Sequence, residues 1–453
     1  MGNDAILTLL CLATFLVYLF RGIVVAAPVE FQSFLEQALY VPANETNVYF
    51  GLLESIFCAS SSISIVWFGH FASRHRALPL FLLGLCLWCG GAGISGAALP
   101  WQNVYVLRLG RILSGVGDGA LQALTPLFLE HHIKSSRQFW MSIYFTNSAL
   151  GTGLSYLFGS MVTYKLGWHW AFYICAISMT PITLVLWLCL RRAEPIPIPD
   201  SNVSETSSEV TLAALGRLLQ CPAFVLSCLG GAAYLFTLKA LATFGPSILL
   251  GVGTFPQLWT AAIFGLTMMA ASCIGSPLGG YIYAFASSRC SSDSSRFSVA
   301  CRHQLAHVVI GIGGFLLMAW KLESPVWFLV GLVVGWISLA GTLSPTTMAV
   351  LLAVPPQLQS VAMRSFTTLA YFLGEVPAPI VVGWVKDWRA SVCWNTQSDL
   401  CLDRLRSVLL WTVLWTGWAV FFAFVVYGIA CCRRRRASKG HNVYVQDTSS
   451  NST

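Results

Sequence analysis

The chain has 453 residues, of which 56% are hydrophobic and 10% are charged, and its formal net charge is +8. The mean hydropathy is +0.70. This composition excludes a soluble enzyme built around one core, because most of the chain requires lipid as its solvent. An apolar segment of about 20 residues crosses a membrane as a helix, which satisfies its own backbone hydrogen bonds there. We therefore expect an all-α membrane protein.

Apolar stretches along the chain predict twelve spanning helices in two groups of six. The first group covers residues 5–28, 49–72, 78–99, 103–130, 139–162 and 169–190. The second group covers residues 221–249, 257–283, 304–321, 326–353, 361–385 and 407–431. The first stretch lacks a basic leading region and contains Arg21, so we interpret it as a helix and not as a cleaved signal peptide.

Four segments follow from this division. Residues 1–190 form an N-terminal six-helix half, and residues 221–431 form a C-terminal six-helix half. Between them, residues 191–220 contain Pro195, Pro197 and Pro199 followed by Ser, Thr and Glu, which predicts a solvated cytoplasmic linker. Residues 432–453 form a basic, polar cytoplasmic tail.

Lysine and arginine residues in the loops predict the orientation. The side of the termini holds most of them: Arg74, Arg76, Lys134, Arg137, Arg191, Arg192, Arg217, Arg289, Arg296, Arg302, Arg433 to Arg436 and Lys439. The opposite loops hold Lys165, Lys321, Lys386, Arg389, Arg404 and Arg406. We therefore expect both termini in the cytoplasm. The same asymmetry explains the positive net charge, so no nucleic-acid partner is expected.

Three modification sites are expected on this basis. Asn44 begins a glycosylation sequon in the first outer loop, and the sequence is compatible with a glycosylated and with an unmodified asparagine. Cys393 and Cys401 share the last outer loop, where an oxidising compartment would allow a disulfide. Cys431 and Cys432 directly precede four arginines, a combination suited to palmitoylation at the inner leaflet. The sequons at Asn202 and Asn451 lie on the inner side and should stay bare.

Ionisable residues inside the spans are the candidates for function, because each costs at least about 2.5 kcal/mol at mid-membrane unless it faces a cavity or a partner. They are Arg21, Glu54, Arg108, Arg111, Asp118, Lys239 and Glu375. Arg111 and Asp118 are seven residues apart, two helical turns, and so share one face. That face either lines a cavity or forms an ion pair that locks helices together.

The other candidates have weaker or mixed signals. Arg21 lies too deep in its span to reach the interface, which favours a cavity role. Glu54 is interpreted as closer to the outer surface and as a weaker candidate. Lys239 could meet an anionic head group or reach the interface. Glu375 precedes two prolines that remove backbone donors, which indicates either a gate or a stabilised kink.

Helix packing and cofactors give further expectations. Gly151, Ser155 and Gly159 recur every four residues, as do Gly275 and Gly279, which predicts close helix packing and surfaces on which the halves could rock. His131 and His132 are adjacent and do not have metal-ligand spacing, so no metal site is expected. No phosphate-binding loop is present, so ATP and other cofactors are not expected.

Several motifs resemble those of Spinster-family transporters. They are GRILSGVGDG at residues 110–119, WHWAF at 168–172, PAFVLS at 222–227, GSPLGG at 275–280, and LGE at 373–375 with Pro379 and Asp387. The resemblance implies the major facilitator fold and transport of lysophospholipids or sphingolipid-type amphiphiles, at lysosomal, late endosomal or plasma membranes and often coupled to protons. Phe20 stands where the family places an acid, and Ser73 replaces another acid. Any proton dependence is therefore expected to run through Asp118 or Glu375.

Together these observations predict a Spinster-like carrier that moves an anionic amphiphile through the bilayer by alternating access. Arginines in the cavity would bind a phosphate or carboxylate head group. Arg21, Arg111, Asp118, Lys239 and Glu375 are the expected binding or coupling residues. A carrier of small organic anions or sugar phosphates and a non-transporting membrane receptor are the alternatives.

Overall fold

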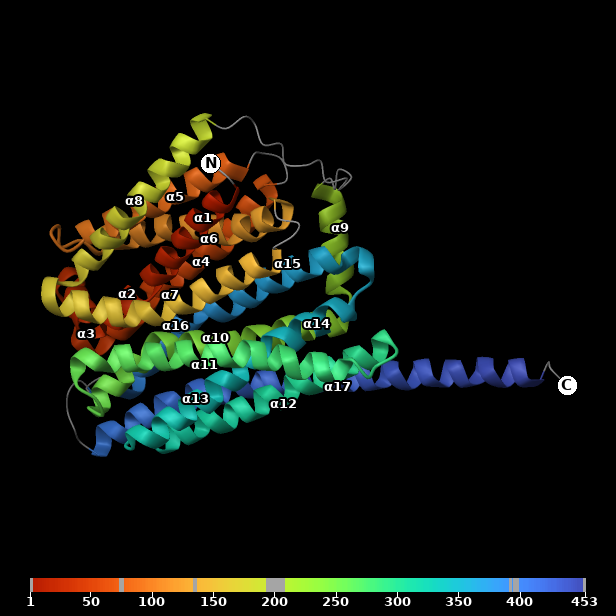
Figure 1. Ribbon diagram of the computed structural model, residues 1–453. Helices are drawn as coiled ribbons and strands as arrows, with labels where there is room; N and C mark the ends of the chain where they lie inside the picture. Colours follow the sequence, from red (N-terminus) through yellow and green to blue (C-terminus); the bar gives the residue numbers. More distant parts are fainter. Residues whose placement is uncertain are drawn as a thin grey trace.

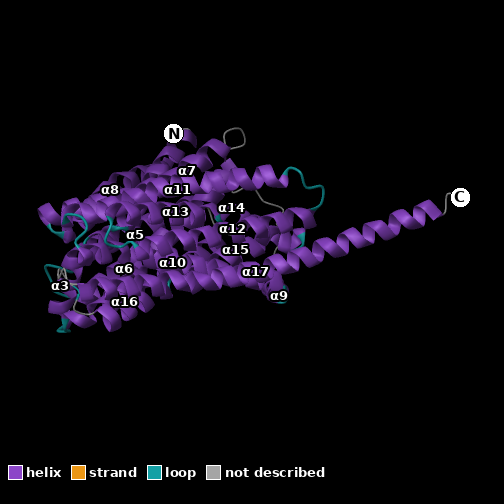
Figure 2. Ribbon diagram, turned by 90° about the horizontal axis from the view of Figure 1, so that it is seen from below, coloured by secondary structure: helices purple, strands orange, loops and turns teal. Residues whose placement is uncertain are grey.

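The computed structural model describes residues 3–72, 77–132, 137–192, 208–390, 393 and 399–450, and every regular element in these ranges is a helix (Figure 1). Several residues considered above lie outside these ranges: Ser73, Arg74, Arg76, Lys134, Pro195, Pro197, Pro199, Asn202 and Asn451. Viewed from below, the helices run nearly parallel in one elongated bundle (Figure 2).

The N-terminal half contains the first six spans. Their helices are α1 (Asn3–Arg21) with α2 (Ile23–Ala26), α4 (Thr46–Ala72), α5 (Ala77–Ala97), α6 (Val104–His132), α7 (Arg137–Leu166) and α8 (Trp168–Arg192). A further helix, α3 (Pro28–Leu39), and the short 3₁₀ turn η1 (Ala43–Glu45) connect α2 to α4. Phe31 and Phe34 of α3 pack against Trp168 at the start of α8. We call this end of the bundle the α3 end.

The C-terminal half contains the other six. Its helices are α10 (Pro222–Val252), α11 (Gln257–Ser287), α12 (Asp293–Trp320), α13 (Pro325–Gly341) with α14 (Leu343–Ala353), α15 (Gln359–Ala370) with α16 (Pro377–Ala390), and α17 (Asp399–Ser450). A 3₁₀ turn, η2 (Pro356–Leu358), precedes α15, and a π-helical segment, η3 (Tyr371–Glu375), joins α15 to α16. The halves stack as two layers, with α9 (Ser208–Leu219) and both chain termini at the end opposite α3, which we call the α9 end (Figure 1).

The fold confirms the expected all-α membrane protein. Over the described residues, nine helical segments are long and apolar enough to cross a membrane, judged by length and composition. The other three spans are α1, α6 and α7. The apolar part of α1 is short, Thr8–Arg21, while α6 and α7 are 29 and 30 residues long but more polar. Two halves of six spans therefore account for the bundle.

Three local features add detail to the expected spans, linker and tail. The first span consists of two helices, because α1 ends at Arg21, just before Gly22, where a Cβ atom would collide with Ser155 of α7. The linker contains a helix, α9, whose Leu218 is buried. The last span and most of the basic tail form one helix, because α17 continues as a straight helix to Ser450, far beyond the bundle (Figure 1).

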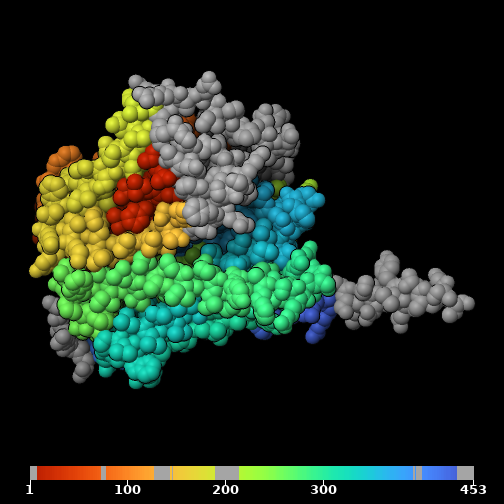
Figure 3. Space-filling view, in the orientation of Figure 1, coloured from red at the N-terminus to blue at the C-terminus, as the bar shows by residue number. Residues whose placement is uncertain are grey.

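Close backbone contacts between the halves lie at the α3 end. There α4 packs against α16, and a Cβ atom at Gly51 or Gly383 would collide with the backbone of the facing helix. Asp387 of α16 accepts hydrogen bonds from the backbone N–H groups of Asn47 and Val48, at 3.1 and 2.8 Å, and so caps α4 across the halves. A second contact joins α7 and α11, which lie side by side on one face (Figure 3).

The small-residue faces expected from the sequence pack inside each half and not between the halves. Gly151 and Gly159 face α1 and α2, while Gly275 and Gly279 face Ile337 and Gly341. Their role as rocking surfaces is therefore wrong. The close backbone contacts between the halves are instead at Gly51 and Gly383, which the sequence pattern did not distinguish because neither has another glycine four residues away.

Candidate functional site

Six ionisable side chains from both halves gather at mid-depth in the bundle, and we call them the charged cluster. Arg21 comes from α1, Glu54 from α4, Arg111 and Asp118 from α6, Lys239 from α10 and Glu375 from η3. The side chains of Glu54, Arg111 and Asp118 are at most 1% exposed. Burial of this many charges is tolerated only where they are paired or meet a ligand.

Asp118 is the most heavily hydrogen-bonded member. The guanidinium of Arg21 donates to both of its carboxylate oxygens, with Nη2 at 2.6 Å and Nε at 3.2 Å. Ser61 and Gln122 also donate to Oδ2, at 2.6 and 2.8 Å. A bidentate pair with two further donors fixes the carboxylate in one orientation.

Glu54 links the two halves of the protein. Its Oε1 accepts a hydrogen bond from Nη2 of Arg111 at 2.6 Å, and its Oε2 accepts one from Nζ of Lys239 at 2.9 Å. Arg111 belongs to the same half as Glu54, whereas Lys239 belongs to the opposite half. One carboxylate therefore bonds two cations that different halves supply.

Arg111 retains a donor that the described residues do not satisfy. Its Nε lies 3.5 Å from the carbonyl oxygen of Leu53, and its guanidinium carbon lies 4.3 Å from the centre of the Phe57 ring. Its Nη1 is buried and has no hydrogen-bond partner in the described part of the chain. A buried guanidinium N–H without a partner costs free energy, and an anionic oxygen would satisfy it.

Phe20 fills the position beside the cluster where the sequence resemblance expects an acid. Its ring packs against Trp88 and Phe172 with centroid distances of 5.0 and 5.3 Å, and it lies 5.5 Å from the guanidinium carbon of Arg111. The chain therefore replaces an ionisable group by an aromatic wall that supports the arginine.

Glu375 differs from the other two acids of the cluster. Its carboxylate makes no hydrogen bond or ion pair with the residues that the structure describes, although Lys239, Arg21 and Asp118 act on it electrostatically. It ends the π-helical segment η3, which the two following prolines leave without a normal helical hydrogen-bond ladder. Gly374 packs against the backbone of Ala232 in α10 and so holds Glu375 close to Lys239.

The structure corrects several details of the sequence interpretation. Arg111 and Asp118 do not pair with each other, because each reaches a different partner on a neighbouring helix. Glu54 is not an outer, secondary residue but the centre of the cross-half contact. Arg108 lies outside the cluster, with its guanidinium 5.5 Å from the Tyr105 ring.

Another buried cation escaped the sequence analysis. Lys386, which the sequence places in an outer loop, lies within α16, is buried, and donates from Nζ to Oγ of Ser247 at 3.0 Å. It shares α16 with Asp387, the residue that caps α4. The position of Lys386 indicates that this part of the expected outer loop belongs to the span that contains α16.

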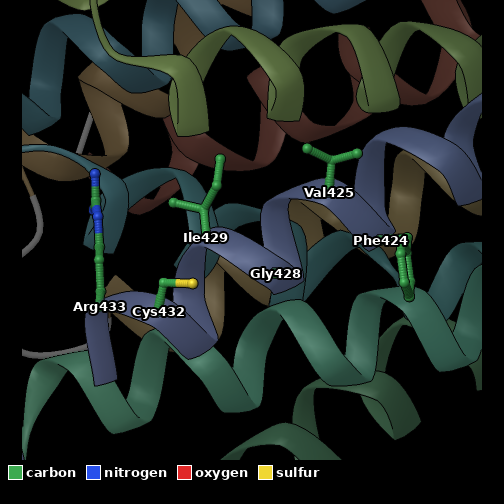
Figure 4. A pocket seen from close by; sticks show the side chains of 6 residues that line it. All are labelled: Phe424, Val425, Gly428, Ile429, Cys432 and Arg433. Carbon is green, nitrogen blue, oxygen red and sulfur yellow. The ribbon is translucent and has the colours of Figure 1, made fainter. Parts of the chain in front are cut away.

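The expected modification sites differ in their exposure. Asn44 is exposed in η1 at the α3 end. Cys393 and Cys401 form a disulfide with a Cα–Cα distance of 5.3 Å. Cys432 is exposed and lines a pocket on α17 together with Phe424, Val425, Gly428, Ile429 and Arg433 (Figure 4). Cys431 is partly buried, with its Sγ 3.9 Å from Oγ of Ser298.

Metal binding finds no support in the described ranges. No group of three or more His, Cys, Asp or Glu side chains in them could hold a metal ion. The side chains of His131 and His132 lie outside the described part of the chain.

Comparisons with known proteins agree with this architecture. A sequence model described as the Major Facilitator Superfamily matches residues 10–379. The "probable sphingolipid transporter spinster homolog 1" of Arabidopsis thaliana is 24% identical over 85% of this chain and 84% of its own length. The "sphingosine-1-phosphate transporter SPNS2" of Mus musculus is 25% identical over 83% and 68%.

A solved structure has the same fold. It is the crystal structure of a bacterial homologue of the human lysosomal transporter Spinster, in an inward-facing and occupied conformation. It superposes with a TM-score of 0.73 at 17% identity and covers 94% of this chain and 96% of that one. The resemblance to Spinster transporters that the motifs indicated is thereby confirmed.

Proposed function

Because the chain belongs to the major facilitator superfamily and is a transporter, not an enzyme, we propose that it carries an anionic amphiphile of the lysophospholipid or sphingolipid type. The observation that carries this proposal is the charge balance of the cluster. Arg21, Arg111 and Lys239 are three cations, but only two acids, Asp118 and Glu54, are bonded to them. One positive charge is left for either Glu375 or an anionic ligand.

The names of the relatives support a cargo that has a long apolar part. Two of them are named for sphingolipid or sphingosine-1-phosphate transport, and both align with most of this chain. A phosphate group would meet the guanidinium and ammonium donors of the cluster, which favour it over a neutral head group.

Transport proceeds by alternating access in this proposal. The α3 end is closed by the packing of α4 on α16 and by the Asp387 cap, and the related solved structures are described as inward-facing. We assign the α3 end to the outer side and the α9 end, with both termini, to the cytoplasm. Exposed Asn44 and the disulfide between Cys393 and Cys401 then lie on the outer side, where glycosylation and oxidation occur. The membrane is lysosomal, late endosomal or plasma membrane.

Proton coupling, where it operates, runs through Glu375. Asp118 already accepts four hydrogen bonds, two of them from Arg21. Glu375 has no bonded partner among the described residues and can exchange a proton without breaking an ion pair. The groups that face it are Lys239, Arg21 and Asp118, with Tyr18, Tyr234 and Tyr371 around them. When Glu375 is protonated and therefore neutral, the remaining positive charge of the cluster would be available to an anionic ligand.

Flux into proteoliposomes tests the proposal against its alternatives. Purified protein should accelerate uptake of a single-chain lysophospholipid or sphingosine phosphate, and liposomes with the Asp118→Asn variant should not. Faster uptake of small organic anions or sugar phosphates, with no lipid flux, would establish the alternative carrier. Saturable lipid binding without flux would establish a membrane receptor.

A further inference from the structure

Glu54 occupies a position that a bound anion would otherwise hold. Its carboxylate lies between a guanidinium of one half and an ammonium of the other, at 2.6 and 2.9 Å. These are the distances and donors of a phosphate or carboxylate ligand in an arginine–lysine site. Arg111 also keeps one buried donor, Nη1, without a partner in the described ranges, so the site is built for more acceptor oxygens than Glu54 provides.

We infer that Glu54 is a built-in substitute for the anionic group of the cargo and that the cargo displaces it from Lys239 in each transport cycle. The inference rests on the proposed function, because it assigns the anion-binding site of that carrier to Lys239 Nζ and Arg111 Nη1. The ligand class is a phosphate or carboxylate group on an apolar tail.

Exposure determines which of the two bonds is exchanged. Arg111 is fully buried, whereas 19% of the Lys239 side chain is exposed. A ligand therefore reaches Lys239 first. Glu54 remains neutralised by Arg111 when it releases Lys239, so no buried charge is left alone during the exchange. Direct loss of a partner without a substitute would instead leave a buried charge uncompensated.

The exchange also unlocks the halves. Before it, the Glu54–Lys239 ion pair ties α4 to α10, close to the contact between α4 and α16. After it, Lys239 holds the ligand and Glu54 stays with its own half, so this cross-half bond no longer resists opening of the α3 end. Binding of the cargo is thereby coupled to the change of access.

A second cross-half contact provides a matched control. Asp387 also binds across the halves, but its partners are the neutral amide groups of Asn47 and Val48. This contact therefore involves no cation of the charged cluster. Weakening this contact should loosen the α3 end without changing the response to an anion.

Spin-label distances across the α3 end test the inference in full-length protein in nanodiscs. Labels at Tyr40 and Trp320, which are 95% and 70% exposed, report on the two halves after replacement of exposed Cys86, Cys273 and Cys432. The wild type, Lys239→Met and Asp387→Asn are each measured in the presence of dodecyl phosphate, of inorganic phosphate and of dodecyltrimethylammonium. Lys239→Met is preferred to Glu54→Gln because it leaves the Arg111–Glu54 bond intact and so preserves the fold.

We expect dodecyl phosphate, but not the ammonium amphiphile, to raise the open-to-closed ratio of the wild type. Lys239→Met should raise this ratio about tenfold without any amphiphile, as expected for loss of one charge-assisted hydrogen bond, and should no longer respond. Asp387→Asn should also open the α3 end but keep its response to dodecyl phosphate.

Several results would overturn the inference. They are a Lys239→Met distribution equal to that of the wild type, a Lys239→Met variant that still responds to dodecyl phosphate, and a wild type that responds to neither dodecyl phosphate nor inorganic phosphate. A response to inorganic phosphate alone would support the exchange while refuting the amphiphile as cargo. Lipid flux in proteoliposomes with unchanged distances would support the proposed function and refute the role of Glu54.

Discussion

The two halves of the protein contribute unequally to the charged cluster. The N-terminal half supplies Arg21, Asp118, Arg111 and Glu54, which form two ion pairs within that half. The C-terminal half supplies only Lys239, which is bonded across the halves, and Glu375, which has no bonded partner among the described residues. The first set is a preorganised wall whose geometry is fixed before a ligand arrives. The second set consists of groups whose partners can change during transport.

This difference predicts that substitutions in the N-terminal wall act on folding and flux together, whereas substitutions in the C-terminal groups act on coupling. The following variants test that distinction.

The largest effect is expected for Asp118→Asn. It removes the charge that holds Arg21, Ser61 and Gln122 in place, and breaking a pair at this depth costs about 3–5 kcal/mol. Lipid flux in proteoliposomes should fall to background, and the Tm in detergent should also fall. Glu323→Gln, which affects an exposed pair with Arg406, is the control and should change neither quantity. Wild-type flux in Asp118→Asn would refute the view of this half as a required wall.

Glu375→Gln should separate coupling from transport. Because Glu375 is not bonded within the described residues, its neutralisation should leave the Tm close to that of the wild type. Flux stimulated by an inward pH gradient should be lost, while counterflow exchange of substrate should continue at about half the wild-type rate or more. If the wild type does not respond to the gradient, the protein is a uniporter or exchanger. A gradient response that survives in Glu375→Gln would place the proton site elsewhere.

A smaller effect is expected at the close backbone contact between α4 and α16. Gly383→Ala adds a methyl group that collides with Asn47 and should keep the α3 end from closing. We expect counterflow to fall about tenfold, by roughly 1.4 kcal/mol, with little change in Tm. Gly313→Ala on α12 is the matched control, since no atom lies within 4 Å of the added Cβ. Equal rates for both alanine variants would show that this contact does not limit the cycle.

The smallest effect concerns Cys431 and Cys432 of α17. Cys432 opens into the pocket of Figure 4 beside Arg433, a position suited to an acyl group attached at the membrane surface. Hydroxylamine-sensitive palmitate labelling should disappear when both Cys431 and Cys432 are replaced by serine, with flux changed less than about twofold. Labelling that persists in the double variant would exclude these cysteines.

The sequence predicted the spans well, because hydropathy over about 20 residues reports directly on burial in lipid. All six cluster residues were among its candidates, with Glu54 ranked as the weaker one, since a charge inside an apolar span is conspicuous. It could not predict their partners. Arg21 and Asp118 are 97 residues apart, and Lys239 and Glu54 are 185 apart, so only the packing of helices brings them together.

Glu54 shows why depth was misjudged. The sequence places it near the beginning of its span, but Arg111 of α6 and Lys239 of α10 bond its carboxylate there, and its side chain is only 1% exposed. Helix α9 was missed for a different reason. Proline, serine and acidic residues dominate the linker composition and concealed the apolar residues Leu215, Leu218 and Leu219 near its end.

Counterflow with two matched amphiphiles tests the central claim most directly, namely that a cationic cluster shared by both halves selects an anionic head group. Proteoliposomes loaded with a labelled lysophospholipid are diluted into dodecyl phosphate or into dodecanol, which share the same tail. We predict that dodecyl phosphate accelerates efflux in the wild type and that dodecanol does not. Equal acceleration by the two compounds would show that the tail alone is recognised and would contradict the assigned role of Arg21, Arg111 and Lys239.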